Sequence, residues 1–267
     1  MNLYSIGLAA ASGGIAVIIA SLIFGRKPAN KIAYSIVIAI LFFTFNFASK
    51  EFILPDLNLR QALNDIERVT KETPAFGSIK KYEPEVYQKL VDSVLAAVKE
   101  GANQQQIADI VRTQISSLIE SRLAHASDDA LVSYVNVMIS EMEILSNQGN
   151  GLCYKFLFPQ VAGGIDARKA FTKEMQQRDL AALDEIIKSS NTKKTIPEQS
   201  TVMPYLQPVI IALSEKHGDD VTLLDNPSAP NVDKEKLCKV SIDLYRGVLA
   251  LPVEQSAPVL RWMFGQA

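Results

Sequence analysis

The chain has 267 residues, with 27 Lys or Arg against 29 Asp or Glu and a net charge of −2 at pH 7. The acids and bases are interspersed, and no basic patch with interleaved aromatic residues occurs, so nucleic acid is not expected as a partner. The 2 cysteines have no CxxC or CxxH neighbour, which argues against a zinc site. Composition thus disfavours nucleic-acid binding and cysteine-based metal binding.

Two apolar stretches dominate the N-terminus. Ile6 to Phe24 and Ile32 to Ser49 contain no Asp, Glu, Lys or Arg. As helices that rise 1.5 Å per residue, each is about 28 Å long, close to the roughly 30 Å hydrocarbon core of a bilayer. The sequence therefore predicts a transmembrane hairpin over residues 1–54, with helices at about 6–24 and 32–49.

Two other interpretations of this segment are less consistent with its residues. A cleaved signal peptide is disfavoured because Met1 to Ser5 carries no basic side chain and a second apolar stretch follows at once. A pair of buried soluble helices usually keeps a polar face, and residues 32–47 show almost none. We therefore expect residues 1–54 to be embedded in a membrane, which is one predicted partner of the chain.

The basic residues of the connection predict the orientation. Arg26, Lys27 and Lys31 lie between the apolar stretches without an acid, and such connections tend to stay in the cytoplasm. Basic residues from Lys50 onward act in the opposite direction at greater distance. We therefore expect a multi-pass protein of the cytoplasmic (inner) membrane with its C-terminal domain outside, in the periplasm if the host is Gram-negative.

Residues 56–267 are expected to form an all-helical soluble domain, because apolar residues recur at helical spacing and no alternating strand pattern is long enough for a sheet. The predicted fold class is all-α, a transmembrane hairpin followed by a helical bundle, whose two halves would meet near 150–165. Ser127 is expected to cap one helix. The clearest apolar stripes are Val86, Leu90 and Val94; Ile107, Val111 and Ile115; and Leu131, Val135, Met138 and Met142.

The second half contains more interruptions. The spacing predicts one helix over Asp166 to Lys188 and a loop over Ser189 to Ser200. Pro204 and Pro208 are expected at the start, or at a kink, of the next helix. A long loop is then predicted over Asp219 to Val232, before the helix that carries Cys238.

Cys153 and Cys238 are predicted to form a disulfide in the exported domain. They are 85 positions apart, and closing so long a loop is worth about 4 kcal/mol in the loop-entropy model. The alternative is a pair of buried thiols, because free cysteine behaves as a small hydrophobic residue.

The sequence offers no catalytic signature. His125 and His217 fall at expected helix C-termini, where a structural role is favoured. The string His217 to Asp220 lacks the spacing of a zinc helix or a calcium loop. We therefore predict no catalytic residue, no metal site and no cofactor.

An aromatic segment is the strongest binding candidate. Tyr154, Phe156 and Phe158 follow a glycine-rich turn, and Trp262 lies near the C-terminus. These rings are predicted either to fill a buried connection or to form the apolar wall of a cleft.

Three classes of function remain open. The first is a membrane-anchored helical binding protein that acts on a protein or peptide partner at the outer face of the membrane. The second is a small-ligand sensor with an interhelical cavity, and the third is an envelope enzyme without a recognisable motif. The absence of a site signature favours the first class, because a binding surface needs no catalytic motif.

Overall fold

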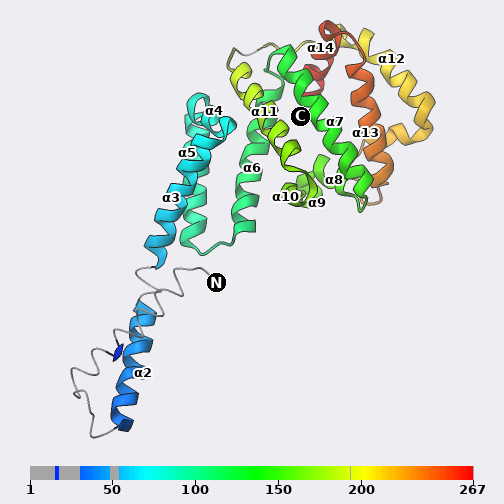
Figure 1. The fold of residues 1–267 in the computed structure, drawn as a ribbon. Helices are drawn as coiled ribbons and strands as arrows, with labels where there is room; N and C mark the ends of the chain where they lie inside the picture. The colour runs from blue at the N-terminus through cyan, green and yellow to red at the C-terminus, as the bar shows by residue number, and fades with distance from the viewer. Residues whose placement is uncertain (1–15, 18–30, 49–53, 193, 267) are drawn as a thin grey trace. The chain divides into compact units, whose positions relative to one another are not determined.

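The computed structural model describes residues 16–17, 31–48, 54–192 and 194–266, and within them it is helical without a β-strand (Figure 1). The predicted all-α class is confirmed. The helices are α2 (Lys31–Ala48), α3 (Leu54–Glu72), α4 (Pro74–Tyr82), α5 (Pro84–Lys99), α6 (Gln104–Leu123), α7 (Asp128–Gln148), α8 (Leu152–Leu157), α9 (Pro159–Ala162), α10 (Ala167–Ala170), α11 (Lys173–Ser189), η2 (Ser190–Thr192), α12 (Gln199–His217), η3 (Gly218–Leu224), α13 (Lys234–Leu249) and α14 (Val253–Phe264).

The second apolar stretch of the N-terminus is helical, since α2 covers it almost completely. The predicted helix over 6–24 lies outside the described residues, apart from Ala16 and Val17. In the part of the chain that the structure describes, no helix reaches the combination of length and hydropathy required to cross a bilayer.

Residue contacts divide the chain into two compact units. One combines residues 1–69 with 89–111, and the other combines 70–88 with 112–267. In the first unit, Leu90, Val94 and Ala97 of α5 are buried, on the face that the apolar spacing predicts.

The core of the second unit forms around α7, which lies between α11 and α13 and also packs against α14 (Figure 1). Leu131, Val135 and Met142 on this helix have no exposed surface. The predicted cap is confirmed, because the Ser127 hydroxyl accepts a hydrogen bond from the Ala130 N–H at 3.3 Å. The later helices α11, α13 and α14 therefore pack against different sides of α7.

A smaller apolar cluster joins α4, α6 and α11 in the same unit. Ile79 of α4 is 1% exposed, as is Ile187 of α11, and Leu118 of α6 belongs to the same cluster. Helix α4 begins with Pro74 at its first position, where the missing N–H of proline costs nothing.

The expected single helix over Asp166 to Lys188 is wrong. The structure ends α10 at Ala170 and starts α11 at Lys173. The cap at Thr172 imposes this break, because its hydroxyl accepts from the Met175 N–H and starts α11. The Asp166 carboxylate accepts from the Arg168 N–H and caps the start of α10. Local hydrogen bonding therefore overrides the continuous apolar spacing.

Two further boundaries follow in the second half. Helix α12 begins at Gln199 and includes Pro204 and Pro208 in its interior, so neither proline marks its start, and the alternative of a kink stays a prediction. The stretch expected as a long loop after His217 opens with the 3₁₀ helix η3. Short 3₁₀ segments commonly extend the end of an α-helix.

Candidate functional site

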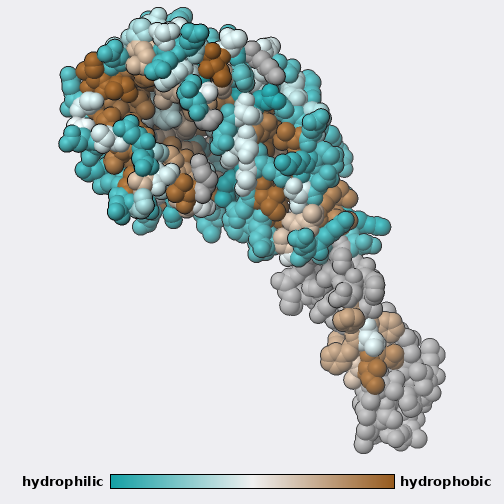
Figure 2. All heavy atoms as spheres, turned by 180° about the vertical axis from the view of Figure 1, so that it is seen from behind, coloured by the Kyte–Doolittle hydropathy of each residue, from teal (hydrophilic) through white to brown (hydrophobic). Residues whose placement is uncertain are grey.

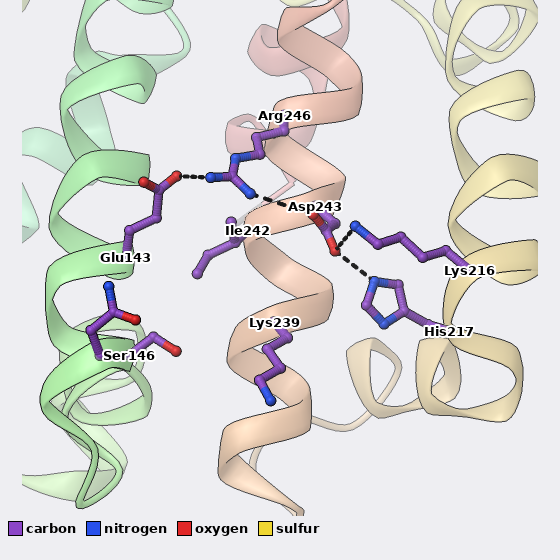
Figure 3. Close-up of a pocket in the computed structure, with 9 residues that line it drawn as sticks. Glu143, Ser146, Lys216, His217, Lys239, Ile242, Asp243 and Arg246 are labelled. Atoms are coloured by element: carbon purple, nitrogen blue, oxygen red, sulfur yellow. Dashed lines mark hydrogen bonds and ion pairs between the residues drawn. The ribbon is translucent and has the colours of Figure 1, made fainter.

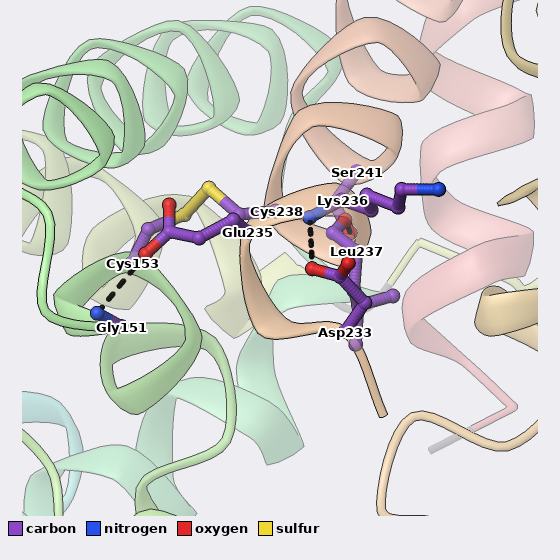
Figure 4. Close-up of a disulfide and its surroundings, with 8 residues drawn as sticks. All are labelled: Gly151, Cys153, Asp233, Glu235, Lys236, Leu237, Cys238 and Ser241. Atoms are coloured by element: carbon purple, nitrogen blue, oxygen red, sulfur yellow. Dashed lines mark hydrogen bonds between the residues drawn. A yellow bond between two sulfur atoms is a disulfide. The ribbon is translucent and has the colours of Figure 1, made fainter. Parts of the chain in front are cut away.

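The disulfide between Cys153 and Cys238 fastens α8 to α13 (Figure 4). Their Cα atoms are 6.0 Å apart, and the two side chains are 2% and 1% exposed. The Gly151 N–H donates to the Glu235 carboxylate at 3.1 Å beside the disulfide. The predicted pairing is confirmed, and α13 is held at its first turns.

The four aromatic residues predicted for binding lie in or against the core. Tyr154 is 3% exposed and donates its hydroxyl proton to the Pro227 carbonyl at 3.1 Å, and its ring packs on Phe158 with centroids 5.1 Å apart. Phe156 meets the edge of another core ring, and Trp262 packs against the main core. The structure pairs Tyr154 with Phe158 only, so a shared binding role for the four stays a prediction.

An open polar hollow lies among α7, α12 and α13 (Figure 3). Its volume is about 450 Å³. In Figure 3 the side chains of α12 and α7 point toward α13 from opposite sides. The lining residues are Glu143, Ser146, Asn147, Lys216, His217, Lys239, Ile242, Asp243 and Arg246.

Asp243 is the centre of the ion pairs in the polar hollow. The Lys216 ammonium and the His217 ring N–H both donate to one carboxylate oxygen at 2.7 Å. Arg246 lies 3.7 Å from the other oxygen and also pairs with Glu143. Burial alone raises the pKa of Asp243, but the hydrogen bonds from Lys216 and His217 outweigh burial and hold the pKa below its usual value.

The polar hollow has more positive than negative side chains. Its lining includes three basic side chains, Lys216, Lys239 and Arg246, and two acidic ones, Glu143 and Asp243. His217 adds a further positive charge whenever it is protonated. Lys239 is exposed and makes no ion pair within the described residues. The chain as a whole carries a net negative charge, so this hollow differs in sign from the average surface.

An apolar hollow of about 320 Å³ continues from the polar one, because Lys216 and Asp243 line both. Its apolar lining comes from Pro208, Val209, Ala212 and Leu213 of α12 and from Gly247 of α13. We call the polar and apolar hollows together the groove.

Gly247 allows α12 and α13 to approach closely at the apolar end of the groove. A Cβ atom at this position would lie 2.7 Å from Val209 Cγ1. Helix α12 also exposes apolar side chains, with Ile211 53% and Tyr205 36% exposed. Figure 2 shows apolar side chains gathered at its upper left, where α12 lies in that view.

Sequence reasoning missed the groove, although one signal was present. Lys239, Asp243 and Arg246 recur at i, i+4 and i+7 and therefore share one stripe of α13. His217 was predicted at a helix C-terminus and is the last residue of α12. Its contact with Asp243 depends on packing between helices and carries no sequence signature. His125 has a structural contact: its Nδ1 lies 2.8 Å from the Lys194 carbonyl.

Comparison with known proteins gives no further indication, since no protein family, curated protein or solved structure matches the chain. Among the described residues no group of His, Cys, Asp or Glu side chains has the arrangement of a metal site. The groove and its surroundings are therefore the candidate functional site.

Proposed function

We propose that this chain is a membrane-anchored helical binding protein. Its N-terminal hairpin holds the helical domain at the outer face of the cytoplasmic membrane, and the groove between α7, α12 and α13 captures a protein or peptide partner. The observation that carries the proposal is the groove itself: an open concave surface that is apolar at one end and cationic at the other. Apolar surface with a few charged groups is typical of recognition sites.

The surface of α2 supports the membrane tether. Ile40, Phe43 and Phe47 are exposed by 56%, 70% and 66%. Leaving such side chains in water costs free energy in proportion to their apolar area, whereas the hydrocarbon core of a bilayer would cover them. The hydroxyl of Thr44 donates to the carbonyl of Ile40 at 3.0 Å, so this polar group is satisfied inside the helix.

The disulfide supports a location outside the cytoplasm. Bonds of this kind persist in oxidising compartments and are rare in reducing ones. The basic connection at Arg26, Lys27 and Lys31 favours the same orientation. Because Cys238 is on α13, the bond also stiffens a helix that lines the groove.

Topology and capture can be tested in the same cells. Alkaline phosphatase fused after Ala267 should be active, and a green fluorescent protein fused there should be dark. A photo-crosslinking amino acid at Ala212, which is exposed and lines the groove, should give one discrete adduct with a partner in the full-length protein. The same amino acid at Lys173, on the exposed start of α11, should not.

An inactive phosphatase fusion together with a bright fluorescent one would contradict the outside location. The absence of an adduct at Ala212, or equal adducts at Ala212 and Lys173, would contradict capture through the groove.

A further inference from the structure

We propose that the groove recognises an acidic amphipathic segment of a partner protein, with an apolar side chain in the hollow between Pro208 and Gly247 and a carboxylate on Lys216 and Lys239. This ligand class rests on the proposed binding function and deepens it. Charge complementarity, the continuity of the two hollows and the exposed face of α12 lead to it.

The cationic end has unused capacity for a carboxylate. Asp243 already accepts from Lys216 and His217 and lies near Arg246. Lys239 contributes a further ammonium without an ion pair in the described part of the chain. An arriving carboxylate therefore finds Lys239, which has no ion pair among the described residues, beside donors that share the two acids Asp243 and Glu143. Charge-assisted hydrogen bonds of this kind are the strong ones.

The apolar end of the groove can bind an aliphatic side chain of the ligand. Val209 and Leu213 are 9% and 4% exposed and contribute to its apolar lining, and the contact between Val209 and Gly247 holds α12 close to α13. Ile211 and Tyr205 expose further apolar area on α12. A ligand side chain placed here is removed from water, which is the main source of affinity for apolar groups.

The spacing of the two ends constrains the ligand. Pro208, Ala212 and Lys216 all line the apolar hollow and recur at intervals of four along α12, so they form one stripe. Eight residues of helix rise about 12 Å, and an extended chain covers that distance in about four residues. The segment should therefore carry its acids about four residues from its apolar side chains.

The acids of the groove argue against a polyanionic surface as the ligand. Glu143 and Asp243 line the cationic end together with the lysines, and they would repel the dense phosphates of an anionic membrane or a nucleic acid. A single carboxylate can approach the lysines without meeting both acids. A protein segment with one or two acidic side chains fits this pattern better.

The test uses the full-length protein in neutral detergent and fluorescein-labelled peptides of equal length. The first peptide carries two leucines followed after four residues by two aspartates. Matched peptides replace the aspartates by asparagine, the leucines by serine, or the aspartates by lysine. Fluorescence anisotropy should show binding of the first peptide, weakened at least tenfold by each replacement and weakened by added salt.

A variant with a reversed charge in the groove tests the same ligand class from the side of the protein. Lys239→Glu should weaken binding of the first peptide at least tenfold, because it places like charges together. Lys173→Glu makes the same change in net charge on α11, outside the groove, and should leave the affinity unchanged. Circular dichroism on both variants checks that the helical fold is retained.

Three outcomes would overturn the ligand class. These are no binding of the first peptide, equal binding of the matched peptides, and an equal effect of Lys239→Glu and Lys173→Glu. Displacement of the bound peptide by detergent micelles doped with phosphatidylglycerol, but not with phosphatidylcholine, would favour an anionic lipid instead. The crosslink at Ala212 separates the two proposals: an adduct without peptide binding refutes only the ligand class, whereas no adduct together with peptide binding refutes only capture in the cell.

Discussion

The guanidinium of Arg261 on α14 donates to the carboxylate of Asp128, the first residue of α7, at 2.8 Å. The same guanidinium donates to the Ala126 carbonyl at 2.7 Å, and the Arg261 side chain is only 5% exposed. The last helix of the chain is therefore tied to the start of its central helix by a nearly buried cation.

Loss of this cation should destabilise the second unit. Arg261→Ala leaves the Ala126 carbonyl and the Asp128 carboxylate without these donors, and we expect the free energy of unfolding to fall by about 2–3 kcal/mol. Urea denaturation followed by circular dichroism measures the change. Arg168→Ala is the matched control, because that side chain is 62% exposed and surface pairs contribute about 0–1 kcal/mol. Equal losses of stability for the two substitutions would contradict the prediction that the buried Arg261 contributes more than a surface ion pair.

The disulfide should contribute a stabilisation that reductant removes. Replacing Cys153 and Cys238 together by alanine opens a loop whose ends are 85 positions apart, and we expect a loss of about 4 kcal/mol. Dithiothreitol should lower the urea midpoint of the wild type and leave that of the double variant unchanged.

Alkylation of the denatured, unreduced protein from its native membrane provides a direct check. Blocked thiols that reductant releases would agree with the structure. Two freely labelled cysteines would show that the bond is not formed in the cell, and they would weaken the proposed outside location.

Glu141 should make the stability fall as the pH rises. It is 3% exposed on α7; burial, followed by the nearby charge of Asp179, raises its pKa from 4.5 to about 8. A folded-state pKa above the unfolded value means that the folded state binds the additional proton. The contribution of Glu141 to stability is therefore fully present below pH 4.5 and is lost progressively as the pH rises through about 8.

Glu141→Gln removes this titration. We expect the variant to be more stable than the wild type at pH 8.5 and to gain less at pH 5, with a difference on the order of 1.4 kcal/mol for each unit of pKa shift. Urea midpoints at several pH values give the comparison. Glu120→Gln, at an exposed position of α6, should show no such dependence. A pH-independent effect of Glu141→Gln would contradict the predicted titration.

Gly247→Ala should destabilise the packing of α12 on α13. The new Cβ atom would lie 2.7 Å from Val209 Cγ1, and overpacking of this kind costs about 1–3 kcal/mol. Gly77→Ala is the matched control within α4, where the nearest atom, the Thr70 carbonyl oxygen, is 3.4 Å away. There we expect the ordinary gain of about 0.5–1 kcal/mol for replacing glycine inside a helix.

A compensating change tests the same contact. Adding Val209→Ala to Gly247→Ala removes the clashing methyl group, so the double variant should lose less stability than the two single losses added together. Simple additivity in thermal unfolding would count against a direct steric conflict.

The local features of the fold could be predicted from the sequence. Ser127 caps α7 because its hydroxyl needs only an N–H three residues ahead. The stripe of Leu131, Val135 and Met142 is buried because 3.6 residues per turn place these side chains on one face of α7. Where two local signals competed, at Thr172, the cap decided and the apolar spacing misled.

The candidate site was decided by tertiary structure. Arg246 pairs with Glu143 across 103 positions, and His217 meets Asp243 only because α12 packs against α13. That packing depends on a missing methyl group at Gly247 and on the side chain of Val209 opposite it. Helical periodicity predicts which face of a helix is apolar. The volumes of side chains that are distant in the sequence decide which helix packs against that face, because a close-packed interior must accommodate them together.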